Sequence, residues 1–117
     1  MHAYIWRVAL ARDGRSDQAI LSLREAVRTM PGYGDAHFNL ANVLQGTGRA
    51  EEAVPHYRSA LEVDPTDAAA HANLGAAYES LDRRAEAASH YREAIRLDPS
   101  SAQARAGLAR LAGGTRD

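Results

Sequence analysis

The sequence predicts an all-α protein, a solenoid of three helix–turn–helix repeats followed by a closing helix. The first observation is a period of 34 residues, which separates Pro31 from Pro65 and Pro65 from Pro99. A fixed period of this length is typical of repeat architectures. The second observation is the composition, which is rich in alanine and has only 6% aromatic residues; alanine favours helix over sheet. The third is that each of these three prolines stands where a helix should end, because proline cannot continue a helix.

Each period has room for two helices. Residues 35–45 carry apolar residues at helical spacing, and Gly48 is placed to end that helix. A second helix is expected at about 51–63, and the next proline stops it. Two residues are available to accept hydrogen bonds from the free amides of the helix that follows, Thr66 and Asp67.

We therefore expect a single domain over residues 1–112, with about seven helices. Its expected parts are repeat one at about 1–33, repeat two at 34–67, repeat three at 68–101, the closing helix at 102–112 and a flexible tail at 113–117.

The period and the residues at fixed places within it resemble the tetratricopeptide repeat (TPR) family. Small residues recur where paired helices must approach closely, such as Ala41 opposite Ala53 and Gly75 opposite Ala87. The resemblance implies a right-handed solenoid whose first helices line a concave face, and a role in protein–protein interaction. The strings DAHFNLANVLQ and AAAHANLGAAY are also similar to the TPR arm of O-GlcNAc transferase, in which an asparagine ladder holds substrate backbone. Arg7 departs from the family pattern, which has glycine or alanine at that place.

Composition and charge argue against several classes of protein. The net charge is −1, whereas a protein that binds a phosphate backbone needs a basic surface, so we expect no nucleic-acid partner. There is no cysteine, which excludes disulfides and thiolate chemistry. No apolar run approaches the ~20 residues that cross a bilayer, so we expect no membrane partner. The default location is cytoplasmic, and it would not hold if the sequence belongs to a longer chain.

The string HYR occurs in two repeats and resembles a reactive cluster. Tyr57 and Tyr91 fall at a core position of the repeat, so we interpret them as packing residues. His56 and His90 precede them and are expected on the outer surface. Equivalent residues on neighbouring repeats lie ~10 Å apart, whereas zinc–nitrogen bonds are ~2 Å long. A metal ion shared by the two histidines is therefore not expected.

No other group of residues predicts catalysis. His37 and His71 occupy a bulky position between paired helices, where a structural role is expected. The carboxylates lie on helix ends and outer faces, and no glycine-rich phosphate loop or nucleophile turn is present. We therefore predict no enzymatic activity, no cofactor and no metal site.

Asn39 and Asn73 are the main candidates for binding. They recur at one repeat position, although asparagine is a poor helix former. The resemblance places them on the concave face together with Asn42. An asparagine amide both donates and accepts, so it can bind the C=O and N–H of one peptide unit. With repeats ~10 Å apart and an extended chain rising ~3.3 Å per residue, the two asparagines would bind amides three residues apart. The alternative is that both were inherited from one duplicated repeat and bind nothing.

The N-terminal stretch YIWRVAL is apolar on several sides. We predict that four of its residues pack against a preceding domain, a second copy of the chain in a homodimer, or a partner; these are Tyr4, Ile5, Trp6 and Val8. The family's clamp for the C-terminal carboxylates of chaperones is disfavoured, because it uses lysines and this chain has none.

The predicted function is a protein-interaction scaffold that binds an extended peptide segment on its concave face. The residues expected to contact the peptide are Asn39, Asn42, Asn73, Phe38, Tyr4 and Ile5. Two alternatives stay open. The chain could be the substrate-presenting arm of a larger glycosyltransferase-like enzyme, or a structural module that self-associates through its N-terminal helix.

Overall fold

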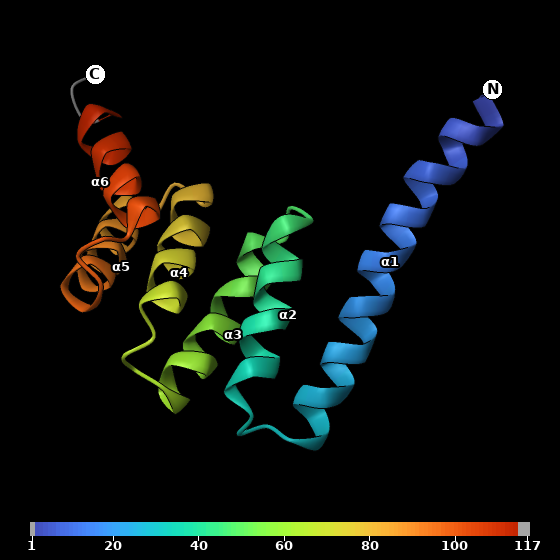
Figure 1. The fold of residues 1–117 in the computed structure, drawn as a ribbon, viewed down its shortest axis with the longest axis horizontal. Coiled ribbons are helices and arrows are strands. Elements are labelled where there is room, and N and C mark those ends of the chain that lie inside the picture. Colours follow the sequence, from blue (N-terminus) through green and yellow to red (C-terminus); the bar gives the residue numbers. More distant parts are fainter. Residues whose placement is uncertain (1, 115–117) are drawn as a thin grey trace.

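The computed structural model describes the backbone of residues 2–114 and the side chains of residues 14–113, and these residues form six helices and no strand (Figure 1). The helices are α1 (His2–Thr29), α2 (Gly34–Gly46), α3 (Ala50–Val63), α4 (Ala68–Ser80), α5 (Arg84–Leu97) and α6 (Ala102–Gly114). They follow one another from α1 at one end of the molecule to α6 at the other (Figure 1). The all-α solenoid and its closing helix are confirmed.

The first repeat differs from the expected hairpin. α1 continues without a break through Gly14, so residues 2–29 form one long helix where two were expected. The prediction of about seven helices is therefore wrong for the described residues. At the equivalent places Gly48 and Asp82 have φ angles of 83° and 59°, and these left-handed conformations end α2 and α4. A glycine within a helix costs ~1 kcal/mol relative to alanine but does not forbid the helix, so Gly14 alone cannot enforce a turn.

The two complete hairpins, α2–α3 and α4–α5, turn in the same way. The amide of Arg49 donates to the carbonyl of Leu44 at 2.8 Å, and the amide of Arg83 donates to that of Tyr78 at 2.9 Å. This bond closes a helix C-terminus when the residue before it is left-handed. Asp82 fills that position in the second hairpin, and aspartate tolerates the conformation better than most residues. The predicted cap of α4 is also present, because the Asp67 carboxylate accepts from the Ala70 amide at 3.1 Å.

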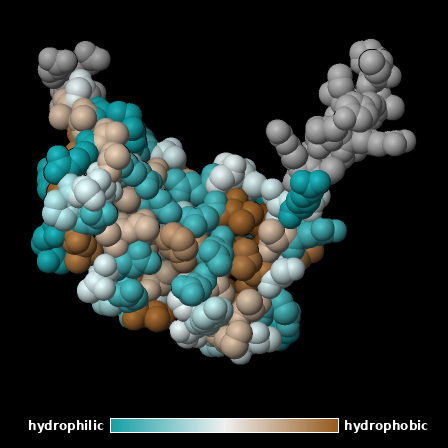
Figure 2. Space-filling model, viewed as in Figure 1, coloured by the Kyte–Doolittle hydropathy of each residue, from teal (hydrophilic) through white to brown (hydrophobic). Residues whose placement is uncertain are grey.

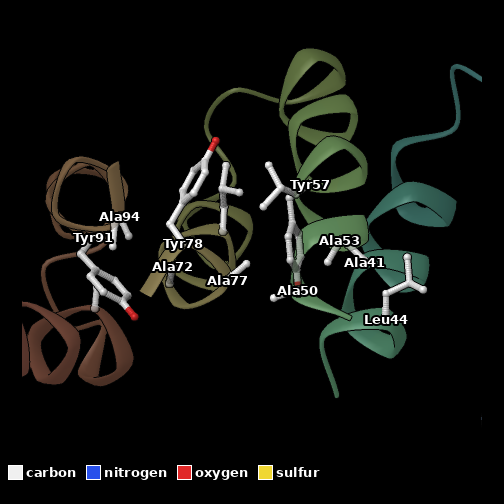
Figure 3. Packing of buried hydrophobic residues seen from close by; sticks show 14 of the residues in the cluster. Ala41, Leu44, Ala50, Ala53, Tyr57, Ala72, Ala77, Tyr78, Tyr91 and Ala94 are labelled. Atoms are coloured by element: carbon white, nitrogen blue, oxygen red, sulfur yellow. The ribbon is translucent and has the colours of Figure 1, made fainter. Parts of the chain in front are cut away.

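A tyrosine forms the centre of each hairpin's core (Figure 3). Tyr57 and Tyr91 are 1% and 0% exposed, as the repeat position predicted. Tyr91 lies against two glycines that leave room for its ring. A Cβ atom on Gly75 would stand 2.8 Å from Tyr91 Cδ1, and one on Gly107 would overlap the ring. Small residues are therefore required on both α4 and α6 for this ring to fit.

The closing helix is fixed by polar contacts as well as by packing. Arg110 on α6 donates to both oxygens of Glu79 on α4, from Nε at 3.0 Å and from Nη2 at 3.1 Å. Tyr91 Oη donates to the same carboxylate at 2.7 Å. Arg84 Nη2 donates to the carbonyl of Leu111 at 2.5 Å. α6 is thus joined to both helices of the preceding hairpin.

Substitution of Gly107 by alanine should weaken the packing of α6 against the α4–α5 hairpin. The added methyl group overlaps the Tyr91 ring, and overpacking of a core costs ~1–3 kcal/mol. We expect the free energy of unfolding of Gly107→Ala, measured in urea, to fall by that amount. Gly46→Ala is the matched control, because nothing lies within 4 Å of the added atom and alanine favours helix; it should leave stability equal or higher. Equal losses in both variants would contradict the packing argument.

Candidate functional site

The contacts between helices show which side of the solenoid is concave. α2 contacts α4, and α4 contacts α6. Among the described residues, α3 and α5 share no such contact, although each packs on the helices before and after it. Helices that touch their counterparts in the next repeat lie on the inside of the curve, so α2, α4 and α6 form the inner layer (Figure 1).

A chain of side-chain amides crosses this inner layer. Asn73 Nδ2 on α4 donates to Asn42 Oδ1 on α2 at 3.0 Å. Gln103 Nε2 on α6 donates to Asn73 Oδ1 at 2.9 Å. From behind, Tyr57 Oη on α3 donates to Asn42 Oδ1 at 2.5 Å. We call Asn39, Asn42, Asn73 and Gln103 the amide strip.

Gln45 continues these contacts at the end of α2. A phenol has one proton, and the Tyr57 proton goes to Asn42, so Gln45 must donate to Tyr57 Oη. With its amide in that orientation, Gln45 Nε2 lies 2.9 Å from Tyr57 Oη and 3.3 Å from the Asn73 carbonyl, and its oxygen accepts from the Ala77 amide at 3.2 Å. The tyrosine hydroxyl therefore organises two amides of the inner layer. Burial raises the pKa of Tyr57, so the hydroxyl keeps its proton.

The strip keeps donors and acceptors that no described residue uses. Asn39 is exposed and forms no hydrogen bond with the described part of the chain. Asn42 accepts two hydrogen bonds, and its Nδ2 donates none to a described residue. Phe38 is half-buried and meets Tyr57 edge-on, with 6.1 Å between ring centroids. The side chains of Tyr4, Ile5, Trp6 and Val8 lie outside the described residues.

Two shallow hollows lie between the α2–α3 hairpin and α4, at opposite ends of these helices. One of about 240 Å³ is lined by residues that include Asp35, Phe38, Val63 and Asp67, and one of about 480 Å³ by residues that include Gln45, Glu51 and Ser80. Hydrophilic and hydrophobic residues alternate over α2 and α4 on the side seen in Figure 2. On α6, Arg110 is bound by Glu79, and this hydrogen bond lowers the pKa of the Glu79 carboxyl. On α2, Asp35 is an exposed carboxylate four residues before Asn39.

Comparison with protein families identifies the repeats. Two family models described as "Tetratricopeptide repeat" match residues 32–100 and residues 8–53. The chain belongs to the tetratricopeptide repeat family. No curated protein matches the sequence significantly. None of the helices in the described residues combines the length and apolarity that crossing a membrane requires.

Solved structures with the same TPR fold are distant in sequence. The first TPR of Spaghetti (RPAP3) bound to the HSP90 peptide SRMEEVD has a TM-score of 0.85 and 20% identity, over 91% of this chain and 84% of that one. The Arabidopsis OM64 TPR domain has a TM-score of 0.80 and 24% identity, over 88% and 85%. MamA from Desulfovibrio magneticus RS-1 has a TM-score of 0.84 and 23% identity, over 94% and 62%. These similarities establish the fold alone.

The two complete repeats each contain a histidine pair that sequence reasoning missed. His37 and His56 approach with their Nδ1 atoms 3.2 Å apart, and His71 and His90 do so at 3.1 Å. His56 and His90 were expected on the outer surface; instead they are half-buried and face the preceding helix. A spacing of 19 residues in both repeats is the sequence signal that could have revealed the pairs.

Each pair is completed by a backbone carbonyl. His37 Nε2 lies 2.8 Å from the Pro31 oxygen, and His71 Nε2 lies 3.1 Å from the Pro65 oxygen. In the closing helix Arg105 stands at the same repeat position and donates to the Pro99 oxygen at 2.7 Å. This position therefore supplies a donor that binds the turn before its own helix, which is a structural role.

Removal of the Tyr57 hydroxyl tests its place beneath the amide strip. Tyr57→Phe leaves the ring but deletes the bonds to Asn42 and Gln45, and a net hydrogen bond contributes ~0.5–1.5 kcal/mol to stability. We expect the free energy of unfolding, measured in urea, to fall by about 1–2 kcal/mol, since two half-buried amides lose a partner. Tyr33→Phe is the control, because Tyr33 is 49% exposed; its stability should not change measurably. A neutral Tyr57→Phe would show that the hydroxyl does not support the strip.

Proposed function

We propose that this TPR chain is a non-enzymatic protein-interaction scaffold that binds an extended peptide segment on its concave face. The observation that carries the proposal is the amide strip, in which side chains from α2, α4 and α6 are joined across the inner layer while Asn39 and Asn42 keep free hydrogen-bonding groups. Fixed amides of this kind suit a ligand whose own backbone offers donors and acceptors.

The spacing of the helices suits an extended backbone. Packed helices lie ~8–10 Å apart, and an extended chain advances ~3.3 Å per residue, so neighbouring helices face peptide units about three residues apart. Because the Asn42–Asn73–Gln103 contacts already hold these side chains in place, their ordering costs little entropy when the peptide binds. The two hollows beside α2 and α4 can receive peptide side chains.

Two similar structures support the class of ligand. The first TPR of Spaghetti is bound to an HSP90 peptide, and the second TPR domain of human RPAP3 is in complex with the HSP70 peptide SGPTIEEVD, at 20% and 21% identity to this chain. No described residue favours the reading of the chain as the arm of a glycosyltransferase-like enzyme, so that alternative stays a prediction. The cytoplasmic location and the similarity to O-GlcNAc transferase also stay predictions.

Asn39 gives the cleanest test because its removal breaks no described bond. A peptide would be selected from a random library displayed on phage and its affinity measured by calorimetry. Loss of one backbone hydrogen bond is worth ~1 kcal/mol, or about fivefold in Kd, so Asn39→Ala should bind at least fivefold more weakly. N-methylation of the contacted peptide unit should weaken binding to the native chain and have little effect on the variant.

Two further variants control this experiment. Ser89→Ala alters an exposed residue of the outer layer and should bind like the native chain. Residue 69 stands in the same relation to Asn39 as Gln103 does to Asn73. In Ala69→Gln the new amide should therefore donate a hydrogen bond to Asn39 and weaken peptide binding. Equal affinity for all four proteins would overturn the proposed role of the strip.

The charge of the face predicts which peptides bind poorly. Asp35 on α2 is an exposed carboxylate, and Arg110 on α6 is already bound to Glu79, so neither residue attracts a terminal carboxylate. SRMEEVD and its C-terminal amide should therefore bind with affinities within about twofold of each other, which fluorescence anisotropy can measure. A free acid that binds tenfold or more tightly, a difference of ~1.4 kcal/mol, would show that a cation is engaged.

A further inference from the structure

The two histidine pairs each contain a single proton between the facing nitrogens. A carbonyl oxygen only accepts, so His37 Nε2 must carry the proton that reaches Pro31. In the neutral ring, Nδ1 of His37 is then an acceptor, and His56 Nδ1 must donate to it across 3.2 Å. The same reasoning assigns His90 as the donor to His71.

Each neutral histidine pair can bind one additional proton without losing its Nδ1–Nδ1 hydrogen bond, but it cannot bind a second. The first can bind Nε2 of His56, which leaves the Nδ1–H of His56 donating to His37. A second proton can bind only Nδ1 of His37, because the other nitrogen of that ring already carries one. Two N–H groups and two positive charges would then face each other across 3.2 Å. The pair cannot keep its geometry in that state.

The surroundings of each pair add further positive charge. His56 is faced by His37 from α2 and Arg24 from α1, with Glu52 on its own helix. Burial, then His37 and then Arg24 lower the pKa of His56, and Glu52 opposes them.

The second pair has the same arrangement. His90 is faced by His71 from α4 and Arg58 from α3, with Glu86 and Glu93 on α5. Burial, then His71 and then Arg58 lower the pKa of His90, against the two glutamates. Arg24 and Arg58 stand 34 residues apart, so the charge arrangement repeats with the fold.

The pairs lie in the seams that hold the hairpins together. His37 and His56 join α2 to α3, and His71 and His90 join α4 to α5. The His90 ring also stacks on Tyr78, with 5.6 Å between centroids. Tyr78 is fully buried, and its hydroxyl has no hydrogen-bond partner within the described part of the chain. Separation of this seam would expose that hydroxyl to water, which lowers the cost of opening.

We propose that the two histidine pairs are proton-operated clasps that keep the α2–α3 and α4–α5 hairpins closed at neutral pH and release them in acid. The proposal does not depend on a peptide ligand. A closed pair can hold one added proton and an open pair two, so acid favours the open state, and the two clasps act through the same chemistry in successive repeats.

The sign of the pH dependence follows from the lowered pKa values. A histidine whose pKa is lowered in the folded chain binds more protons when the seam is open, so acid favours the open state. The stabilisation is complete above the ordinary value of 6.5 and is lost as pH falls through 6.5 toward the lowered values. The carboxyls with lowered pKa values, Asp64, Glu79 and Glu93, lose their contribution only below their ordinary values of 3.8 to 4.5. The window from pH 7.5 to pH 5 therefore isolates the histidines.

The test compares chains with two, one and no intact pairs. In His56→Asn the amide can donate to a neutral His37 and accept from a protonated one, so the seam is kept without a second charge. In the native chain the unfolding constant should rise across this window by up to about tenfold per pH unit for each proton taken up. His56→Asn should retain about half of the logarithmic change, and His56→Asn/His90→Asn almost none. An equal pH dependence in all three chains overturns the proposal.

Nuclear magnetic resonance of the native chain provides an independent measurement that needs no variant. The ring shifts of His56 and His90 should change only as pH falls below the ordinary value of 6.5, and they should change together with faster amide exchange in α3 and α5. Titration of both rings near 6.5 with unchanged amide exchange would contradict the clasp, even if the variants failed to fold.

Discussion

The fit of one tyrosine in each hairpin is the contact on which the rest of this structure depends. The rings of Tyr57 and Tyr91 are buried between paired helices, and this is possible only because small residues face them, as Gly75 and Gly107 do for Tyr91. The hydroxyls reach past the core into the inner layer, where Tyr57 binds Asn42 and Tyr91 binds Glu79. The same side chain thus sets the distance between helices and fixes the polar groups of the concave face.

Features that repeat with the period were accessible from the sequence. The tyrosine core, the turn at Gly48 and the cap at Asp67 depend on residues close together along the chain or in register, and all three are present. The amide strip was predicted only in part. Gln103 comes from a helix outside the full repeats, and the Gln45 beside the strip forms its bonds to α3 and α4 only because of how its side chain is oriented. Periodicity assigns a residue to a face but does not say which side chains meet across two helices.

The first repeat shows where local and repeated signals disagree. Gly14 occupies the turn position, yet α1 continues through it, because a turn is stable only when the two helices that it joins gain from packing. The other repeats provide Ala41 and Gly75 at the point of close approach, whereas the first has Arg7. The family pattern predicted the turn, and the sequence departs from that pattern at this one register.

The two recurrent asparagines show how one repeat position comes to have two roles. Asn73 has an amide neighbour on each side, Asn42 in the repeat before and Gln103 in the helix after, and both are bonded to it. In the same register the residue after Asn39 is Ala69, which offers no amide, and Asn39 is left exposed. Residues that are identical in every repeat satisfy the fold. Differences between repeats decide which amides remain free, and recognition on this face therefore depends on the positions where the repeats are not alike.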